Sequence, residues 1–531
     1  MSIPEAESSE RPLRLSMVLP VLIPWAVVLG IAVAGIDFGE HFDEHYMIES
    51  VERTIDREVL LPGFYNYPSM LYSLCLAALL PDATATLAQN PGLGRERIDA
   101  LKPIALEKIH TKGYTLRARV VSAFVSSLAV VWVYLLVLVW RRKWGEALLA
   151  AGLMASSWEV GYHLRYIAVD AVMMQFGALV MLLVVAYLRY PAQRWLLWAA
   201  AIAAGFATST KYPGGLLILP VLAADAMTWS GRGDWAKRAT RLVLLGVTFA
   251  AAYLVITPGT VLEPIKFIGN VSYEFKHYKG GHFGHTVAPG PQHFMKILRY
   301  DTLDMLSPYK AIASAFFVLS VAGAICALRK TPKIAALYIA LPVLYTLYFT
   351  MQRVMFVRNL TLAAPFLAVC AAMGVGALWA MWSNKVWRGA LAAACSAAVI
   401  ASVVWQAEAV STIRDRNTVR FLRDALAYAD AHPNERIFTP AITHERLAAV
   451  RASLPSNLVT DTASATQALF IWTDGFPDGW QTFPANIPRD VVAWFGPKAT
   501  NFPYATAWPE EMIVVTPIAW AREHGVRGIT P

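Results

Sequence analysis

Long apolar runs separated by short basic turns make up most of the chain as far as residue 407. A helix of about 20 predominantly apolar residues crosses the hydrocarbon core of a bilayer. Windows of this kind occur at 15–36, 117–140, 144–161, 169–189, 195–210, 213–230, 240–257, 310–328, 333–350, 359–382 and 387–407. The pattern predicts an all-α polytopic membrane protein with about eleven spanning helices.

The positive charges orient these helices. With residues 1–14 on the inner side of the membrane, every short inner turn is basic, as the positive-inside rule requires. The inner turns carry Arg141, Arg142, Lys143, Arg189, Arg194, Arg232, Lys237, Arg238, Arg241, Arg329, Lys330, Lys333, Lys385 and Arg388. A single extra span would reverse the topology of everything after it.

Two segments test the orientation. The stretch 66–81 is apolar but short, and it lies between Pro68 and Pro81. A span there would move most of the basic turns outside, so we expect a re-entrant or interfacial segment instead. The first apolar window follows Arg11 and Arg14 but lacks a convincing cleavage site, so it is expected to be a retained anchor rather than a signal peptide.

Three regions then lie outside the membrane on one side, the loops 37–116 and 258–309 and the C-terminal segment 408–531. The last alternates helix-like stretches at 417–431 and 443–453 with strand-like stretches at 436–440, 457–460 and 468–472. This alternation predicts a small extracytoplasmic α/β domain. Its aromatic end is expected to pack as core more readily than to form a ligand platform: Trp494, Phe495, Phe502, Tyr504 and Trp508.

Composition supports the membrane assignment. Of the 531 residues, 56% are hydrophobic and only 16% charged, and the mean hydropathy is +0.45, which excludes an array of soluble domains. The net charge of +9 is explained by the inner turns rather than by nucleic-acid binding. The four cysteines have no metal-binding or disulfide-framework spacing and are expected to be buried: Cys75, Cys326, Cys370 and Cys395.

The first outer loop opens with a dense group of acidic residues and histidines, Asp37, Glu40, His41, Asp43, Glu44, His45 and Glu49. Adjacent carboxylates at Asp43 and Glu44 repel each other and lose hydration at the membrane surface, which favours a carboxylate that can act as a general base. The alternative is a solvated acidic turn that caps the helix predicted at 48–55. The sequence leaves both interpretations open.

Charged residues also follow several spans on the outer side. His163, Arg165 and Asp170 lie within or next to spans, where charges usually pair with each other or with a substrate. An Arg165–Asp170 structural pair is the simpler explanation for two of them. Lys211 ends the fifth span and either snorkels to the interface or contacts a substrate.

Arg353 and Arg358 lie on the outer side against the charge rule. An anionic partner such as a phosphate would explain cations retained on this face, although headgroup anchoring would account for one of them.

The second outer loop gathers Glu263, Glu274, His277, His282 and His285. Glu274 and His277 would share a helix face. Such a set can bind a divalent cation, although the spacing matches no metal motif and metal binding is the minority interpretation. Gly280 and Gly281 are predicted hinges of a loop that closes over a site.

At these residues the chain resembles a membrane glycosyltransferase of the GT-C fold, related to protein O-mannosyltransferases and to the aminoarabinose transferases that modify lipid A. The resemblance covers about residues 15–400 and rests on five segments. In FDEHYMIESVERTIDREVLLPGFYNYPSMLY the pair Asp43-Glu44 and the Tyr67-Pro68 step match the family pattern. The others are HLRYIAVDA, STKYPGGLLILP, TPGTVLEPIKFIGNVSYEFKHYKGGHFG and VRNLTLAAPFLAV, in which Asn359 replaces an expected tyrosine.

The resemblance implies an inverting transfer of a sugar from a polyprenyl-phosphate donor to a lipid, glycan or protein acceptor, in the periplasm or outside a bacterial plasma membrane. By this analogy Asp43 is the base or acceptor-orienting carboxylate and Glu44 supports it. The phosphate would be held by Arg165, Lys211 and Arg358, and Asp170 would order the loop. Tyr67, His163, Glu274, His277, His282 and Arg353 are the further predicted substrate-binding residues.

Two other classes of protein remain as alternatives. A polyprenyl-linked sugar or lipid transporter would place polar residues near the bilayer midplane and show paired halves. An assembly protein recruiting partners through 408–531 leaves the outer carboxylates and arginines unexplained. The C-terminal domain lies outside the region of resemblance and is expected to screen access or to bind the acceptor.

Overall fold

The computed structural model describes residues 14–38, 41, 43–89, 95–229, 234–282, 285–414, 418–471, 491–495, 513–526 and 528–529. The chain divides into two compact units. The first comprises Met1–Val33 and Asp43–Gln406, and the second comprises Ala34–Phe42 and Ala407–Pro531. Glu40, from the acidic opening of the first outer loop, lies outside the described residues.

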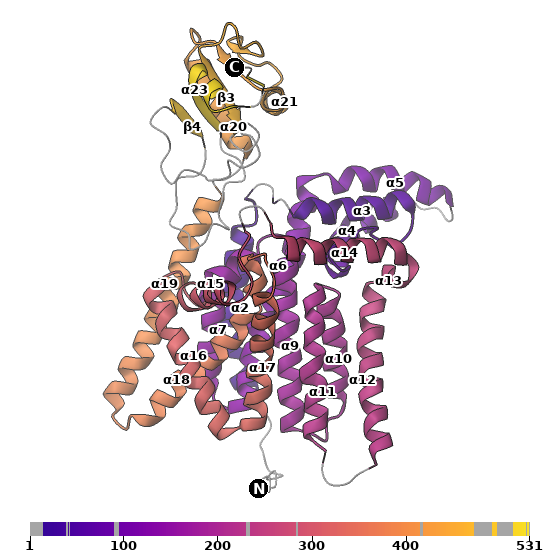
Figure 1. Cartoon of the computed structure of the whole chain (residues 1–531), viewed down its shortest axis with the longest axis vertical. Helices are drawn as coiled ribbons and strands as arrows, with labels where there is room; N and C mark the ends of the chain where they lie inside the picture. Colours follow the sequence, from indigo (N-terminus) through magenta and orange to yellow (C-terminus); the bar gives the residue numbers. More distant parts are fainter. Residues whose placement is uncertain are drawn as a thin grey trace. The chain divides into compact units, whose positions relative to one another are not determined.

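The first unit is a bundle of apolar helices (Figure 1). Within the described residues, nine helices are long and apolar enough to cross a membrane, which confirms a multi-pass membrane protein. Eight of them coincide with predicted spans: α1–η1–α2 (Leu15–Ala34), α6 (Lys112–Arg141), α9 (Val169–Arg189), α12 (Trp235–Ile256), α16 (Lys310–Lys330), α17 (Pro332–Thr350), α18 (Ala363–Met381) and α19 (Lys385–Arg414).

Three other predicted spans are shorter helices. The span at 144–161 is interrupted at Ser157, where α7 (Trp144–Ser156) ends and α8 (Trp158–His163) begins, because the Ser157 side chain accepts a hydrogen bond from the Val160 N–H and caps α8. The remaining two are α10 (Trp195–Thr208) and the pair η2 (Tyr212–Leu217) and α11 (Ile218–Met227). The predicted segments are therefore helical, with less uniform lengths than hydropathy suggests.

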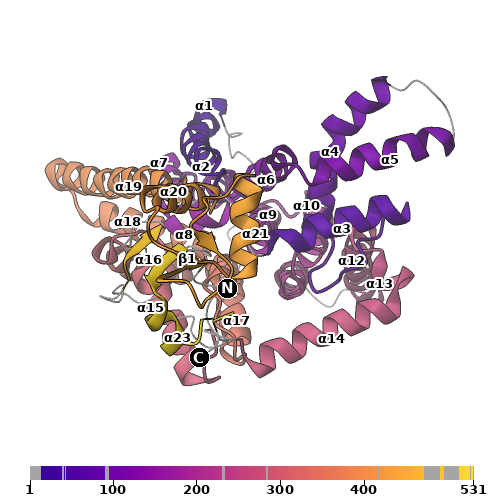
Figure 2. The same cartoon turned by 90° about the horizontal axis from the view of Figure 1, so that it is seen from above.

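The ninth long helix is α4 (Met70–Gln89), which starts inside the stretch set aside as re-entrant or interfacial. Figures 1 and 2 show α4 lying across one end of the bundle together with other helices of the two outer loops. These are α3 (Glu44–Arg57), α5 (Arg95–Ile109), α13 (Gly259–Leu262), α14 (Pro264–Gly280) and α15 (Pro291–Leu303). Length and composition alone would have counted α4 as a span.

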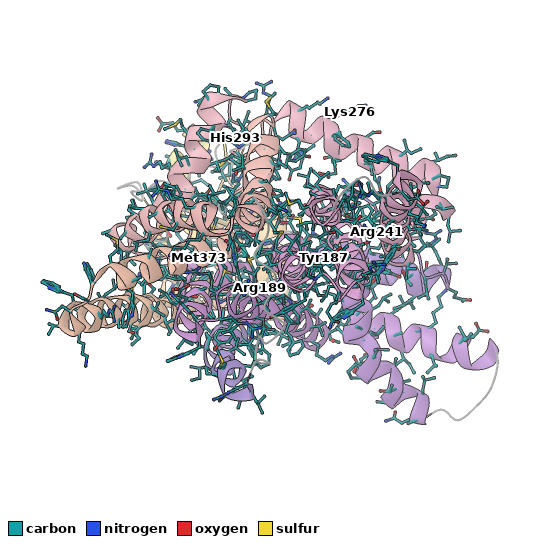
Figure 3. All side chains as sticks on the ribbon, turned by 90° about the horizontal axis from the view of Figure 1, so that it is seen from below. Tyr187, Arg189, Arg241, Lys276, His293 and Met373 are labelled. Carbon is teal, nitrogen blue, oxygen red and sulfur yellow. The ribbon has the colours of Figure 1, made fainter. Side chains whose placement is uncertain are left out.

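The predicted inner turns lie at the opposite end of the bundle. Figure 3 views the chain from that end and labels Arg189, which closes α9, and Arg241, in the first half of α12. Arg241 forms an ion pair of 2.8 Å with the buried carboxylate of Asp225 on α11. One of the inner-turn cations therefore also fastens two helices together.

Helices α16 and α18 touch backbone to backbone. A Cβ added to Gly323 would overlap the carbonyl oxygen of Cys370, and one added to Gly374 would overlap the carbonyl oxygen of Leu319. Small residues at such crossings allow the close approach that drives helix packing inside a membrane. The contact lies in the middle of α18, and the short helix η3 (Val357–Leu360) lies directly before α18.

The second unit contains a five-stranded sheet with strand order β2-β1-β3-β5-β4. Strand β1 (Ile437–Phe438) runs parallel to β2 (Leu458–Val459) and β3 (Gln467–Ile471), whereas β5 (Ile513–Pro517) runs antiparallel to β3 and β4 (Ala493–Phe495). The helices are α20 (Thr418–Ala431), α21 (Ala441–Val450) and α23 (Ile518–Glu523). The predicted small α/β domain is confirmed.

Two of the aromatic residues at the end of this domain belong to its core. Phe495 packs against the cluster that contains Phe421 and Leu469, and Trp494 packs against the cluster that contains Phe438 and Phe470. Consecutive strand residues point to opposite faces, so both faces of the sheet are covered. The predicted core residues Phe502, Tyr504 and Trp508 lie outside the described residues.

Candidate functional site

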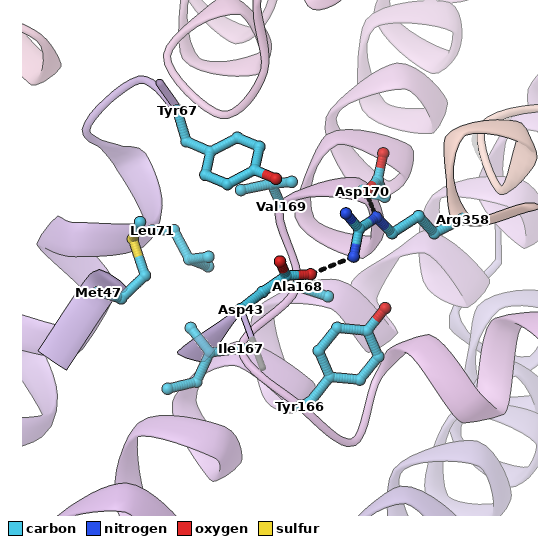
Figure 4. Close-up of a pocket in the computed structure, with 10 residues that line it drawn as sticks. All are labelled: Asp43, Met47, Tyr67, Leu71, Tyr166, Ile167, Ala168, Val169, Asp170 and Arg358. Atoms are coloured by element: carbon cyan, nitrogen blue, oxygen red, sulfur yellow. Dashed lines mark hydrogen bonds and ion pairs between the residues drawn. The ribbon is translucent and has the colours of Figure 1, made fainter. Parts of the chain in front are cut away.

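A small pocket lies where the first outer loop, the α8–α9 connection and η3 meet (Figure 4). Apolar side chains form one side of it, and carboxylate, guanidinium and phenol groups form the other. It is lined by Asp43, Met47, Tyr67, Leu71, Tyr166, Ile167, Ala168, Val169, Asp170 and Arg358. The structure thus brings together four predicted site residues from sequence positions up to 315 apart.

Arg358 is the central cation of the pocket. Its Nη1 donates a hydrogen bond to the Asp43 carboxylate, and its Nε lies 3.8 Å from Oδ2 of Asp170. The guanidinium also stacks over the Phe356 ring, 4.6 Å from the ring centre. Asp43 immediately precedes α3, and Arg358 lies in η3, so the start of the first outer loop and the segment before α18 meet in this ion pair.

Lys211 extends the charge network below the pocket. Its Nζ donates to Oδ1 of Asp170 at 2.6 Å and to Oδ1 of Asn359 at 2.5 Å. All three side chains are buried, and Tyr278 donates a longer hydrogen bond of 3.4 Å to Asn359. Lys211 is therefore not a snorkelling residue. It connects Asp170, at the N-terminus of α9, to Asn359.

Glu44 does not line the pocket but shapes its wall. Its carboxylate accepts from Nε of Arg119 at 2.9 Å, from Nη2 of Arg119 at 2.5 Å and from the backbone N–H of Ile167 at 2.9 Å. The side chains of Glu44 and Arg119 are only 4% and 2% exposed. Glu44, the residue next to Asp43, thereby ties the start of α3 to α6 and to the α8–α9 connection. Its role is to position this part of the pocket wall.

Arg165 and His163 lie in the same connection but have other partners. Asp170 pairs with Lys211 and Arg358, so the suggested Arg165–Asp170 pair is wrong. The Arg165 guanidinium instead stacks on Trp158 at 4.9 Å, and no protein group within the described residues hydrogen-bonds to it. Nδ1 of His163 lies 2.7 Å from the Glu159 carbonyl oxygen.

Arg353 lies at the surface. Its backbone N–H donates to the carbonyl of Tyr278 and its carbonyl accepts from Val287, both at 2.9 Å, in a short antiparallel contact that includes a bridge between Thr286 and Val354. Its side chain is exposed. The backbone of Arg353 therefore holds the second outer loop in place, while its side chain is available at the rim.

One face of α14 is directed toward the pocket region. Asn270 accepts from the backbone N–H of Tyr65 at 2.7 Å, Glu274 accepts from Asn66 at 2.8 Å, and Tyr278 reaches Asn359. These α14 residues are spaced four apart and share one helix face. Burial raises the pKa of Glu274 above its ordinary value, and the Asn66 hydrogen bond opposes that rise only in part.

The histidines of the second outer loop form a row of rings. The ring centres of His277 and His282 lie 5.0 Å apart, and those of His282 and His285 lie 5.8 Å apart. Burial lowers the pKa of both His282 and His285, and Arg358 lowers both further. Among the described residues, His, Cys, Asp and Glu form no group of three arranged to hold a metal ion, so a divalent cation stays a prediction.

A glycine closes the helix that carries the first of these histidines. Gly281 has a φ of 101°, a left-handed conformation that side chains rarely adopt, and a Cβ there would crowd Thr286. The chain reverses at this point into the loop that pairs with Arg353. Gly281 occupies one of the two predicted hinge positions, and the hinge motion itself stays a prediction.

Sequence reasoning missed four residues of this region. Arg119 is a charged residue within a predicted span, which by itself marks a functional or paired position. Asn359 had been noted only as a departure from the family pattern. Tyr166 and Tyr278 carried no signal, because tyrosines at a membrane interface are common.

Taken together, the fold and the pocket define a multi-pass membrane protein with a charged, amphipathic pocket at one end of its helices. The family model for "Dolichyl-phosphate-mannose-protein mannosyltransferase" matches residues 102–269. This segment contains Arg119, Arg165, Asp170 and Lys211, and the match confirms the resemblance to that family over this part of the chain. No curated protein sequence matches the chain significantly.

Solved structures with similar helix arrangements include ArnT from Cupriavidus metallidurans in the apo state, with a TM-score of 0.49 and 13% identity over 94% of this chain and 98% of that chain. The same protein bound to undecaprenyl phosphate gives 0.47 and 13%, over 93% and 97%. The archaeal oligosaccharyltransferase AglB from Archaeoglobus fulgidus, in complex with an inhibitory peptide and a dolichol-phosphate, gives 0.46 and 11%, over 86% and 69%.

Proposed function

We propose that this protein is an inverting glycosyltransferase that moves a sugar from a polyprenyl-phosphate donor to an acceptor on the outer side of a bacterial plasma membrane. The observation that carries the proposal is the ion pair of Arg358 and Asp43 in a pocket with an apolar wall. A cation that can bind a phosphate and a carboxylate that can accept a proton lie within one hydrogen bond of each other.

The proposed donor site uses the two buried cations. Arg358 and Lys211 are each held by carboxylates, so a phosphate entering the pocket would replace Asp43 as the partner of Arg358. Fixed cations stabilise the charge that develops on a leaving phosphate. The apolar side of the pocket, with Met47 and Leu71, matches the hydrocarbon chain next to such a phosphate. An amphipathic ligand therefore fits both halves of the pocket.

The proposed reaction forms a bond between an acceptor oxygen and the anomeric carbon as the bond from that carbon to the phosphate oxygen breaks. The leaving polyprenyl phosphate keeps the bonding electron pair and is held by Arg358 and Lys211. For a hydroxyl acceptor, Asp43, released from Arg358 by the donor phosphate, takes the hydroxyl proton. For a phosphate acceptor no base is required and Asp43 is a positioning group.

The other predicted residues take supporting places in this proposal. Glu44 positions Asp43 through Arg119 and the Ile167 N–H, and Asp170 orders the α8–α9 connection through Lys211. Tyr67 lines the pocket with its hydroxyl facing the charged side (Figure 4).

The remaining candidates, His163, Arg165, His277, His282 and Arg353, lie around the pocket without lining it. We propose that they contact the parts of the substrates that extend beyond it.

Transfer is tested with the full-length protein in lipid nanodiscs and a panel of polyprenyl-phosphate sugars, by measuring release of polyprenyl phosphate. We expect one donor to be turned over, and Asp43→Asn to reduce that turnover at least about 100-fold, in the range of a lost general base. Asp56→Asn is the matched control, since Asp56 lies on the same α3 with a 68% exposed side chain paired to Lys102.

Two results would contradict the proposal. If none of the donors is turned over, the proposed transferase function is refuted. Movement of an intact lipid-linked sugar between leaflets would indicate a transporter instead. Unchanged turnover in Asp43→Asn would remove Asp43 as an essential base.

We further propose that the C-terminal α/β unit screens access to the pocket or binds the acceptor. A truncation before residue 410 is expected to retain donor binding and to lose acceptor-dependent turnover. Full activity of the truncated chain would refute this part.

A further inference from the structure

The acceptor side of the pocket region carries an additional acidic residue. Glu274 is bound to Asn66, next to Tyr67, and its helix neighbour Tyr278 reaches Asn359, next to Arg358. Its face of α14 thus meets the chain segments on both sides of the pocket. The carboxylate adds to the two already present, Asp43 and Asp170.

The charges of the surrounding groups are unbalanced once Glu274 is counted. Arg358 and Lys211 pair with Asp43 and Asp170, and their positive charges also act on Glu274. The neighbouring His282 and His285 do not correct this at neutral pH, because burial and Arg358 lower the pKa of each. A donor phosphate would add a further negative charge to this group.

We propose that Glu274 determines acceptor specificity, selecting an uncharged, hydroxyl-bearing acceptor and rejecting one that carries a phosphate. The proposal rests on the proposed transferase function and deepens it. A carboxylate accepts hydrogen bonds from hydroxyl groups, and like charges brought together across a binding surface cost several kcal/mol. Arg358 and Lys211 would already hold the donor phosphate, so neither is left to bind a second one.

Several observations support this assignment for Glu274 in particular. Burial raises the pKa of Glu274, whereas the positive charges of Lys211 and Arg358 lower it. Glu274 therefore shares their electrostatic surroundings. The Tyr67 hydroxyl faces the pocket. Burial raises its pKa, and the negative charges of Asp43 and Glu274 raise it further. Asn66 donates to one oxygen of the Glu274 carboxylate, and among the described residues the other oxygen has no hydrogen-bond partner.

The test uses the donor that the full-length protein turns over in nanodiscs, with two acceptors of equal chain length, octyl glucoside below its micelle concentration and octyl phosphate. Wild-type protein is expected to use octyl glucoside at least about tenfold better in kcat/KM, by the cost of juxtaposed like charges. In Glu274→Gln this preference should fall about tenfold, mainly through a lower KM for octyl phosphate.

Glu263→Gln is the control for a purely structural role. Glu263 directly precedes the same helix, its side chain pairs with Arg57 at 2.7 Å, and it does not line the pocket. It anchors α14 without adding charge to the acceptor side, so the variant is expected to keep the wild-type preference. An equal loss of preference in both variants would show that Glu274 acts only by anchoring α14.

The outcomes separate this inference from the proposed function. If no donor is turned over, the transferase fails. If the donor is turned over and wild-type protein uses octyl phosphate as well as octyl glucoside, only the role of Glu274 fails. If Glu274→Gln is inactive, two further measurements decide. Retained acceptor preference in Glu274→Asp supports the proposal. Equal thermal stabilisation of wild type and Glu274→Gln by octyl phosphate overturns it.

Discussion

The buried pair of Glu44 and Arg119 permits a quantitative prediction about the pocket wall. Replacing Glu44 by glutamine preserves the shape of the side chain and an oxygen for the Ile167 N–H. It removes the negative charge opposite a guanidinium whose side chain is 2% exposed. Breaking a buried ion pair from one side costs about 3–5 kcal/mol, because the remaining charge stays buried without its partner.

The reverse replacement and the double variant complete the cycle. Arg119→Met leaves the carboxylate without its guanidinium and is expected to cost about the same. The combination Glu44→Gln with Arg119→Met removes both charges, so its cost should be much smaller than the sum of the two, with a coupling of about 2–3 kcal/mol for residues in direct contact. Unfolding of the purified protein in mixed micelles with increasing dodecyl sulfate measures each variant.

Glu52→Gln is the matched control for this cycle. Glu52 lies on the same helix with a side chain 42% exposed and a single contact of 3.5 Å to His110. Exposed pairs contribute about 0–1 kcal/mol, so this variant should unfold close to wild type. A cost below about 1 kcal/mol for Glu44→Gln, or strict additivity in the double variant, would refute the view that the pair fixes the wall.

Three further predictions concern other parts of the unit. Lys211→Met removes one of the two cations proposed to hold the phosphate, and one hydrogen bond to a charged group is worth about 1.5–3 kcal/mol, so farnesyl phosphate should bind about tenfold to a hundredfold more weakly in a fluorescence titration; unchanged affinity would exclude Lys211 from the phosphate site. The pKa of His282 is lowered in the folded protein, so protonation favours unfolding and stability should fall as the pH drops below about 6.5; a His282→Gln variant with the same acid sensitivity would contradict this. Gly323→Ala should lower the unfolding midpoint by forcing α16 from α18, whereas Gly246→Ala, with open space around it, should not; equal effects would show that the crossing tolerates a methyl group.

The sequence predicted the membrane architecture well because bilayer thickness and charge asymmetry act directly on composition. It also placed Asp43, Asp170, Lys211 and Arg358 on one side of the membrane, where the structure joins them in a single network. The sequence could not predict the ion pairs, because which carboxylate meets which cation depends on how the helices pack. Arg165 illustrates this, because a shift of a few residues along the α8–α9 connection decides between facing Trp158 and facing Asp170.

Hydropathy alone does not show whether a helix such as α4 crosses the membrane, for a related physical reason. Hydropathy measures whether a segment is soluble in lipid, and α4 is apolar enough to cross the bilayer. Its direction is set instead by its neighbours α3 and α5, which pack against it. A helix that caps a bundle and a helix that crosses one can therefore have the same composition.

The pocket lies between a closely packed helix pair and a less buried helix. Arg358 and Asn359 lie in η3, directly before α18, and further along α18 Gly374 packs on the backbone of α16 with no side chain between them. Opposite them, none of the residues of α14, all of which the structure describes, is fully buried, and a left-handed glycine ends the helix. A displacement of α14 would break side-chain hydrogen bonds such as those with Tyr65, Asn66 and Asn359, whereas a displacement of α18 would have to separate two backbones.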